Sequence, residues 1–485
     1  LPDPEVRRVL GAAGAEDAEA ALVEADGFDA EAFDSAGTVE LLRSGEFDPC
    51  SLQARPTDLM RRRQHGRAAV AAVAAVVVCG ALLGLPGDGW GRGSAAAPSY
   101  ARNPAAEAAL DPAKVRRTVA GAWETSPRTD FSVWPARGDL VHDQGLLRRA
   151  LAVWARPGAG VRVSATPGTP SGPPMGPPQL LYAGTVDGTR VVLLHDGLRV
   201  VRYAEPASAS RSGALDFARV DDADAASAAA LVVTRSDSNV RYLTAPWVTR
   251  ASVRDLLDPG AEARPLRRDS AGVTDALSSP VQARACASWD TLDVRSGDSD
   301  HLLTDLGELV PARLTSGRPS SPGDVSTAGD RAVWARTACL LPAVRSHGVR
   351  SVNSWQYARQ ALPERGGTAS WVCTRADTWQ GPGSRVLAVF QPPGAAGAAG
   401  AIAAKAEDSP ACGARRPDVL AGVLWRARGG AWYLLAAGSP GFTSVAARGA
   451  VTGSAKGTRL VVRARAGARA ELTGVAGGDT VPALR

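Results

Sequence analysis

The sequence predicts α+β and β-rich exterior domains carried on a single transmembrane helix, with a short helical cytoplasmic segment. Three observations favour this fold class. Residues 68–85 form an uncharged apolar run, and three strand-like segments at 179–205 are separated by Asp-Gly dipeptides that favour tight hairpin turns. Beyond residue 283, short strand candidates recur between glycine-containing turns.

The apolar run AAVAAVAAVVVCGALLGL, at residues 68–85, is long enough to cross a bilayer. As a helix it would extend roughly 27 Å, close to the thickness of a hydrocarbon core. Four arginines precede it: Arg61, Arg62, Arg63 and Arg67. Because arginines collect on the cytoplasmic side, we expect a membrane-spanning helix over 68–87, with lipid around it, residues 1–67 inside and the bulk of the chain outside.

Other interpretations of this run are open. A buried helix of a soluble domain would need no arginine cluster at one end. A cleaved signal peptide is indicated by Ala95-Ala96-Ala97, although this motif lies well beyond Leu85. A lipoprotein signal at Cys79 is disfavoured because Val78 stands where a small residue is needed. An uncleaved anchor is the interpretation that fits best.

The charge is divided unevenly along the chain. Residues 1–60 hold fourteen carboxylates against four arginines, a net charge of −10, whereas the part beyond residue 67 holds 35 carboxylates against 47 basic residues, a net charge of +12. A basic exterior would attract an anionic wall polymer or lipid head groups. A generic basic surface is the alternative. We expect no nucleic-acid partner.

Four cysteines lie in the predicted exterior: Cys286, Cys339, Cys373 and Cys412. An even number in an oxidising compartment predicts disulfides, and pairing sequence neighbours gives Cys286–Cys339 and Cys373–Cys412. A zinc site is the rival interpretation, but the chain has no C-x-x-C motif and no nearby histidine pair. We therefore expect no metal and no cofactor.

The predicted organisation has six parts. They are an acidic cytoplasmic helical segment (1–67), the membrane helix (68–87), a tether (88–110), an α+β exterior domain (111–257), a linker (258–282) and a β-rich, disulfide-bearing exterior domain (283–485).

In the first exterior domain, Asp111-Pro112 predicts a helix that carries Val115, Val119 and Trp123 on one face, and a second helix begins near Asp143. A three-stranded meander follows over 179–205, residues 205–230 form a connection with one helical piece, and strands at 230–235 and 239–244 extend the sheet. In the second, we expect strands at 331–336, 369–375, 384–390, 421–427, 431–437, 458–465 and 468–473. We expect a helix around 350–361, and a helix or loop over 394–406.

Candidate catalytic groups are isolated in the sequence. The pairs His142-Asp143 and His195-Asp196 and the run Ser299-Asp300-His301 lack a G-x-S-x-G nucleophile elbow. We expect His195 to be a solvated histidine of a hairpin turn. Asp221, Asp222 and Asp224 could bind calcium, but the spacing of an EF-hand is absent. No catalytic residue is predicted.

Two further patterns carry little specificity. Arg137-Gly138-Asp139 is an adhesion tripeptide in other proteins, but it is expected by chance in a chain with 52 arginines and 52 glycines. The exterior tryptophans could stack on sugar rings, whereas the scarcity of phenylalanine and methionine favours them as core residues.

The layout of a short inner segment, one anchor and a large exterior resembles uncharacterised actinobacterial single-pass membrane proteins, and more loosely membrane-bound anti-sigma regulators. The zinc-binding H-x3-C-x2-C pattern of the anti-sigma family has no match in residues 1–67, where Cys50 and His65 are the sole cysteine and histidine.

Three functions follow as hypotheses. The first is a membrane-anchored, non-enzymatic extracytoplasmic module that binds a wall polymer, ligand or protein. The second is a transmembrane signalling regulator that acts on a cytoplasmic regulatory protein through residues 1–67. The third is an extracytoplasmic hydrolase.

Overall fold

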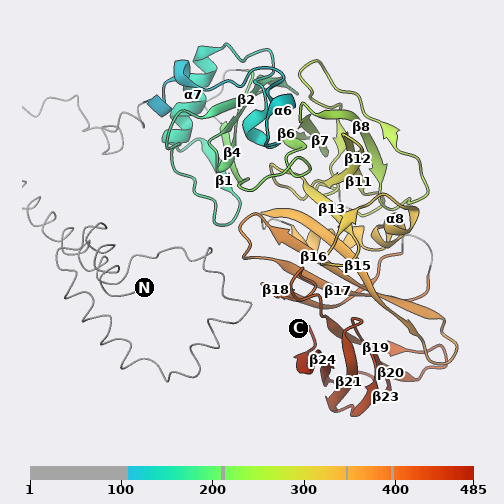
Figure 1. Ribbon diagram of the computed structural model, residues 1–485. Coiled ribbons are helices and arrows are strands. Elements are labelled where there is room, and N and C mark those ends of the chain that lie inside the picture. The colour runs from blue at the N-terminus through green and yellow to red at the C-terminus, as the bar shows by residue number, and fades with distance from the viewer. Residues whose placement is uncertain (1–107, 209–212, 284, 346–347, 395–397, 485) are drawn as a thin grey trace, which may run out of the picture. The chain divides into compact units, whose positions relative to one another are not determined.

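The computed structural model describes residues 108–208, 213–283, 285–345, 348–394 and 398–484 (Figure 1). These residues belong to one compact unit, Ala95–Arg485. The structure is 46% strand and 11% helix, a mixed, sheet-rich fold. The predicted fold class is therefore wrong, because segments that were expected as helices pair as strands or form single short turns.

The predicted fold class also included a membrane helix. No helix within the described ranges is both long and apolar enough to cross a membrane. The predicted span at 68–87, its flanking arginines 61, 62, 63 and 67, the segment 1–67 and most of the tether lie outside the described residues.

The first sheet contains the predicted meander. Its strand order is β1-β5-β4-β3-β2, with β1 parallel to β5 and the other pairs antiparallel. The strands are β1 (Val161–Ala165), β2 (Gln179–Val186), β3 (Thr189–His195), β4 (Arg199–Pro206) and β5 (Gly213–Arg219). The hairpin turn at Asp187-Gly188 has positive φ at both residues, as its sequence requires.

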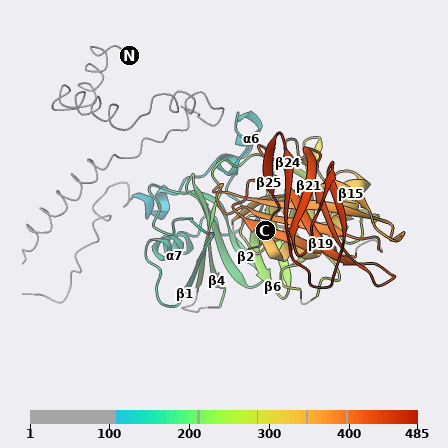
Figure 2. The same cartoon turned by 90° about the horizontal axis from the view of Figure 1, so that it is seen from below.

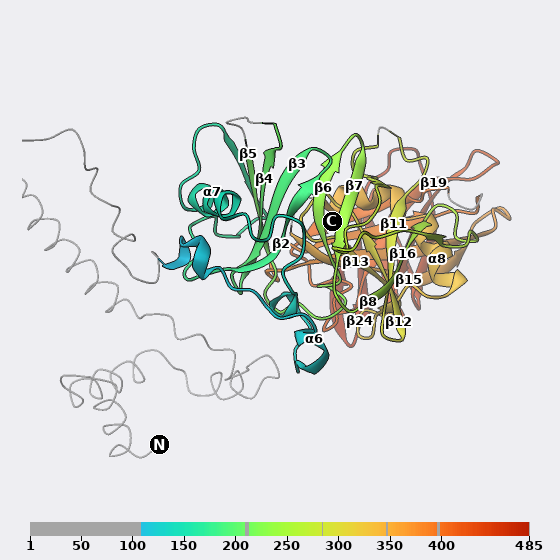
Figure 3. The same ribbon diagram turned by 90° about the horizontal axis from the view of Figure 1, so that it is seen from above.

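Helix α7 (Gln144–Ala155) packs against this sheet (Figure 3). Asp143 caps it by accepting a hydrogen bond from the backbone N–H of Leu146 at 2.9 Å, so the helix begins where the sequence predicted. Leu146, Leu147 and Trp154 face the strands and are buried.

The chain then forms a small sheet and a ten-stranded sheet. The small sheet has the order β10-β7-β6, so β6 (Ala230–Ser236) and β7 (Asn239–Thr244) do not extend the meander as predicted. The large sheet runs β18-β17-β16-β15-β13-β12-β11-β8-β9, with β14 paired to β13. Its long central pair, β15 and β16, is drawn in orange in Figure 1.

The strands of these two sheets are β8 (Val248–Asp255), β9 (Arg264–Pro265), β10 (Leu277–Ser278), β11 (Asp290–Ser296), β12 (Ser299–Thr304), β13 (Ala312–Ser316), β14 (Gly323–Asp324), β15 (Val349–Ala361), β16 (Thr368–Thr378), β17 (Arg385–Gln391) and β18 (Ala401–Glu407).

The C-terminal strands form two small sheets (Figure 2). One has the order β19-β20-β23 and the other β22-β21-β24-β25. The bounds are β19 (Leu420–Arg426), β20 (Trp432–Gly438), β21 (Phe442–Gly449), β22 (Gly453–Lys456), β23 (Arg459–Ala464), β24 (Ala470–Ala476) and β25 (Asp479–Pro482). The two sheets share one apolar cluster that includes Leu434, Phe442 and Leu460.

Several predicted elements differ from the structure. The expected helix around 350–361 is strand β15, and the expected strand at 331–336 lies in helix α8 (Ala328–Ala335). The expected helix carrying Val119 is replaced by the 3-10 turn η2 (Pro112–Lys114) and the four-residue helix α6 (Ala122–Thr125), and Val119 is exposed. The remaining helical turns are η3 (Phe131–Val133) and η4 (Ala338–Val344).

One hydrophobic core joins residues on both sides of the polar stretch 258–282. It contains Trp134 and Leu231 together with Leu292, Leu309 and Trp379. The stretch itself supplies β9, β10 and the loop between them, and Val273 and Leu277 belong to the same core. This packing fixes the loop at 268–274 against β7, where the candidate site lies.

Candidate anion-binding site

Arg137 is held at the edge of the first sheet. Its backbone N–H donates to the carbonyl of Leu181 at 3.2 Å, and its carbonyl accepts from the N–H of Ala183 at 3.0 Å, so the segment pairs alongside β2. Gly138 allows this approach because it has φ +110° and because a Cβ there would collide with the carbonyl oxygen of Ala183.

The side chain of Arg137 extends away from β2 toward the end of β7. Its Nη2 donates to the carbonyl oxygen of Thr244 at 2.7 Å, and its guanidinium carbon lies 5.2 Å from the ring centre of Trp134. Its buried Nε has no hydrogen-bond partner among the described residues. Most of the hydrogen-bonding capacity of this cation is therefore not used by the protein.

Arg268 approaches the same threonine from the loop 268–274. Its Nη1 donates to Thr244 Oγ1 at 3.2 Å and to the carbonyl of Val248 at 2.7 Å, and its Nη2 donates to the carbonyl of Thr249 at 3.0 Å. All of these acceptors are uncharged. Two guanidinium groups thus meet at Thr244 without a carboxylate between them.

Asp269 shapes the loop that carries Arg268. Its Oδ1 accepts from the backbone N–H groups of Ala271 and Val273, at 2.9 and 2.8 Å. The loop then turns at Gly272, where φ is +87° and a Cβ would lie 2.5 Å from Arg137 Nη1. Glycine is therefore needed for the turn and for the space that Arg137 occupies.

These residues line an open cavity of about 460 Å³, which we name the arginine pocket. Its lining includes Arg137, Thr244, Arg250, Arg268 and Ser270, together with one carboxylate, that of Asp269. Arg250 forms an ion pair with Asp300 at 2.9 Å, whereas no ion pair involves Arg137 or Arg268 within the described part of the chain. The pocket presents hydroxyl groups and guanidinium groups, which are ligands for an anion.

Burial disfavours the charged form of Arg137 and, to a smaller degree, that of the partly exposed Arg268. Burial, followed by the charge of Arg268, lowers the pKa of Arg137 to about 10, although the carboxylate of Asp269 acts in the opposite direction. Burial also lowers the pKa of Arg268. An anion placed between them would supply the missing counter-charge.

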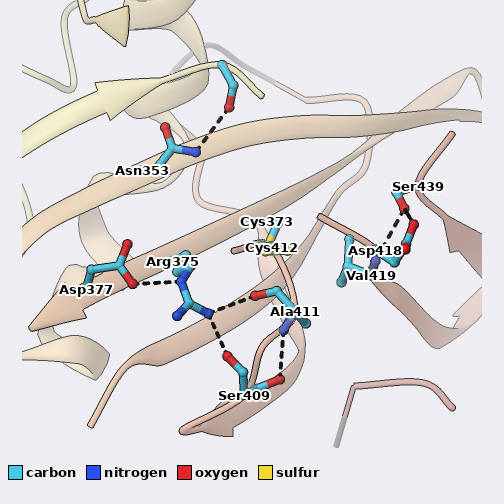
Figure 4. Close-up of a disulfide and its surroundings, with 11 residues drawn as sticks. Asn353, Cys373, Arg375, Asp377, Ser409, Ala411, Cys412, Asp418, Val419 and Ser439 are labelled. Atoms are coloured by element: carbon cyan, nitrogen blue, oxygen red, sulfur yellow. Dashed lines mark hydrogen bonds and ion pairs between the residues drawn. A yellow bond between two sulfur atoms is a disulfide. The ribbon is translucent and has the colours of Figure 1, made fainter. Parts of the chain in front are cut away.

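The structure contains the two cysteine pairs that the sequence favoured. Cys286–Cys339 and Cys373–Cys412 have S–S distances of 2.05 and 2.06 Å. Figure 4 shows how the second pair ties the loop after β18 to β16. Beside it, Arg375 donates to the carbonyls of Ser409 and Ala411 at 2.6 and 3.0 Å, so the loop is held twice.

A cavity of about 520 Å³ lies next to that loop. Its lining combines small apolar residues, among them Pro410, Val419, Val481 and Pro482, with the polar residues Ser409, Arg416, Asp418, Asp479 and Thr480. The hydroxyl of Ser439 donates to Asp418 Oδ1 and accepts from the backbone N–H of Val419 (Figure 4). The cavity has fewer directed polar groups than the arginine pocket and is the weaker candidate.

The histidines named in the sequence do not meet in one site. Asp143 caps α7, and His142 is exposed. His195 is buried at the end of β3, so the prediction of a solvated turn histidine is wrong, and Asp196 instead binds the guanidinium of Arg199. His301 Nδ1 lies 2.9 Å from Asp324, a carboxylate that Arg313 also binds.

Two of the three aspartates considered for calcium are paired within the protein, and the third, Asp222, is exposed. Asp221 pairs with Arg219, and Asp224 bonds to Ser227 and pairs with Arg350. No group of three or more metal-ligating side chains gathers within the described residues.

The tryptophan prediction is confirmed for the core. Eight of the tryptophans within the described residues are buried: Trp134, Trp154, Trp247, Trp289, Trp334, Trp355, Trp371 and Trp379.

No known family model matches the chain, and a comparison with curated proteins finds no similar sequence. The functional argument therefore depends on the geometry alone.

Sequence reasoning assigned Arg137 and Asp139 no functional role, because the tripeptide Arg137-Gly138-Asp139 is expected by chance in this composition, and it did not point to Arg268. In the structure, Gly138 is required by backbone pairing. Arg268 lies within a stretch interpreted as a linker. The run Arg267-Arg268-Asp269 places a carboxylate next to two arginines, which is a weak signal for a loop held by an aspartate. Nothing in this run indicates that Arg268 contacts Thr244.

Proposed function

We propose that this chain is a non-enzymatic extracytoplasmic binding module that holds an anionic group between Arg137 and Arg268. The observation that carries the proposal is the meeting at Thr244 of two guanidinium groups, that of Arg137 largely desolvated and that of Arg268 partly so, with no carboxylate in an ion pair with either among the described residues. Buried charges in proteins are normally paired, so a site of this kind gains stability when an anion binds.

Two further observations support the proposal. The part of the chain beyond residue 67 carries a net charge of +12, which would draw anions toward it. The two disulfides are consistent with an exported protein, because such bonds persist in oxidising compartments.

The test is a calorimetric titration of the full chain with inorganic phosphate. Arg268→Gln should weaken binding by about tenfold or more, because a hydrogen bond to a charged group contributes about 1.5–3 kcal/mol. Arg268→Lys keeps the charge but loses the fork of donors, so its phosphate affinity should lie between that of the unaltered chain and that of Arg268→Gln.

Arg267→Gln is the matched control. Arg267 is the adjacent residue, its side chain is 89% exposed, and it pairs with Asp275. Its substitution should leave phosphate affinity unchanged. Equal losses in the Arg267 and Arg268 variants, or no phosphate binding by the unaltered chain, would refute the proposal.

A further inference from the structure

A second open cavity adjoins the arginine pocket. It has a volume of about 520 Å³ and shares Arg137, Asp269 and Ser270 with the arginine pocket. Its other walls come from Asp139, Tyr182 and Thr185. We name it the Asp139 pocket. Because the same guanidinium lines both cavities, one ligand can occupy them together.

The two cavities differ in charge. The first is lined by three guanidinium groups, those of Arg137, Arg250 and Arg268, and by one carboxylate, that of Asp269, whereas the second is lined by one guanidinium group, that of Arg137, and by two carboxylates, those of Asp139 and Asp269. A phosphate or carboxylate is attracted to the first and repelled by the carboxylates of the second. A ligand that spans both must therefore carry its negative charge at one end.

The Asp139 pocket presents hydrogen-bonding groups suited to hydroxyls. Thr185, Ser270 and Tyr182 supply hydroxyl groups, each a donor and an acceptor, and the carboxylates supply acceptors. Asp139 Oδ1 accepts from the backbone N–H of Thr185 at 3.3 Å, which leaves its second oxygen for a ligand. Burial, together with the charges of Asp269 and Asp139, raises the pKa of Tyr182, so its phenol stays protonated.

Gly184 leaves room for two polar atoms of the residues that line this cavity. An added Cβ would lie 2.4 Å from the hydroxyl of Tyr182 and 2.7 Å from Asp139 Oδ1. The Tyr182 hydroxyl and Asp139 Oδ1 therefore occupy the space that a side chain at position 184 of β2 would fill.

From this division of charge we infer that the ligand is a polyhydroxylated anion. Its negative group lies between Arg137 and Arg268, and its neutral hydroxyl-bearing part lies against Asp139, Thr185 and Tyr182. This inference rests on the proposed function and names the class of ligand for the same site. A sugar or polyol phosphate and a uronic acid share this chemistry.

The experiment compares anions with and without hydroxyl groups on the full chain. Glycerol 3-phosphate should bind about fivefold to tenfold more tightly than methyl phosphate, since two additional hydrogen bonds form. If the natural anion is a carboxylate, glucuronate should bind more tightly than acetate by a similar factor. A gain in either pair supports the inference, and the pair that gains more identifies the source of the charge.

Two variants locate the gain. Thr185→Val removes one hydroxyl with little change of shape, and Asp139→Ala removes one carboxylate. Each should reduce the advantage of glycerol 3-phosphate over methyl phosphate while leaving the affinity for methyl phosphate within about twofold. Asp479→Asn, at an exposed position of β25 in the C-terminal sheets, is the control and should change neither affinity.

The outcomes separate this inference from the function on which it rests. If methyl phosphate binds through Arg268 but hydroxyl groups add no affinity, the inference fails and the proposed function stands. If phosphoethanolamine binds more tightly than glycerol 3-phosphate, the carboxylates bind an ammonium group and the inference is again overturned. If no anion binds, both fail.

Discussion

At the scale of single residues, the unusual feature is a pair of partly buried arginines, Arg137 and Arg268, that form no ion pair among the described residues. Arg199, Arg202 and Arg235 are also largely buried, but each binds an aspartate: Asp196, Asp216 and Asp305 respectively. Arg137 and Arg268 bond to carbonyl and hydroxyl oxygens instead. The contrast within one protein is the reason for assigning a ligand to this pair.

His195 gives a prediction of pH dependence. It is buried beside Phe131, and its Nδ1 lacks a partner within the described residues. Burial lowers its pKa to about 4, although Asp196 and Asp130 partly oppose the shift and Arg116 adds to it. In the unfolded chain the pKa is about 6.5. The unfolded state therefore binds the proton first, and stability falls as the pH drops from about 6.5 toward 4.

Between pH 7 and pH 4.5, the protonation of this histidine should lower the free energy of unfolding by about 2–3 kcal/mol. His195→Leu should remove that part of the acid sensitivity, as measured by urea unfolding at the two pH values. His142→Leu, at an exposed position, should keep the full acid sensitivity. Identical pH dependence in the two variants would contradict the assignment.

The residues of the site were only partly accessible to sequence reasoning. Arg137 and Arg268 are 131 positions apart, and what joins them is the carbonyl and hydroxyl of Thr244. Such a meeting depends on how β2, β7 and the loop 268–274 pack, which no local pattern encodes. The cysteines were more predictable, because compartment and sequence spacing restrict their pairing.

At the scale of elements, turn and capping chemistry predicted more than apolar spacing. The Asp-Gly turns located β2, β3 and β4, and Asp143 located the start of α7. These signals act within a few residues of chain. They do not set the length of an element, because the Asp111-Pro112 signal begins only the three-residue turn η2.

Apolar spacing alone gave wrong elements. Strand β15 was expected to be a helix, but Val352, Trp355 and Tyr357 suit a strand, and β13 and β16 pair with it on both sides. Helix α8 was expected to be a strand. Thr327 and Asp330 form a capping box that starts the helix, and this local signal was overlooked.

At the scale of the whole molecule, the described residues form a set of connected sheets rather than an α+β domain followed by a separate β-rich one. Trp379, at the end of β16, packs in the same core as Trp134 and Leu231. Arg350, on β15, also donates to the carbonyl of Asp222 at 2.8 Å. The candidate site lies in the part of the molecule that this shared core supports.

The cysteines give a prediction for the entire chain. Thiol labelling of the denatured, unreduced protein should find Cys50 and Cys79, and reduction should expose four more thiols, those of the two disulfides. Cys373→Ser should lower stability by about 2–5 kcal/mol and leave Cys412 reactive. Six reactive thiols without reductant, in protein isolated from its native host, would contradict both the pairing and the exported location.

The most direct measurement of the central proposal is a crystal structure of the chain soaked with selenate, whose selenium is located by its anomalous scattering. We expect a selenium peak within hydrogen-bonding reach of both Arg137 and Arg268, next to Thr244, and we expect it to be absent in Arg268→Gln crystals and present in Arg267→Gln crystals. Selenate bound at other surface arginines, with the arginine pocket empty, would contradict the assignment of this pocket as the anion-binding site.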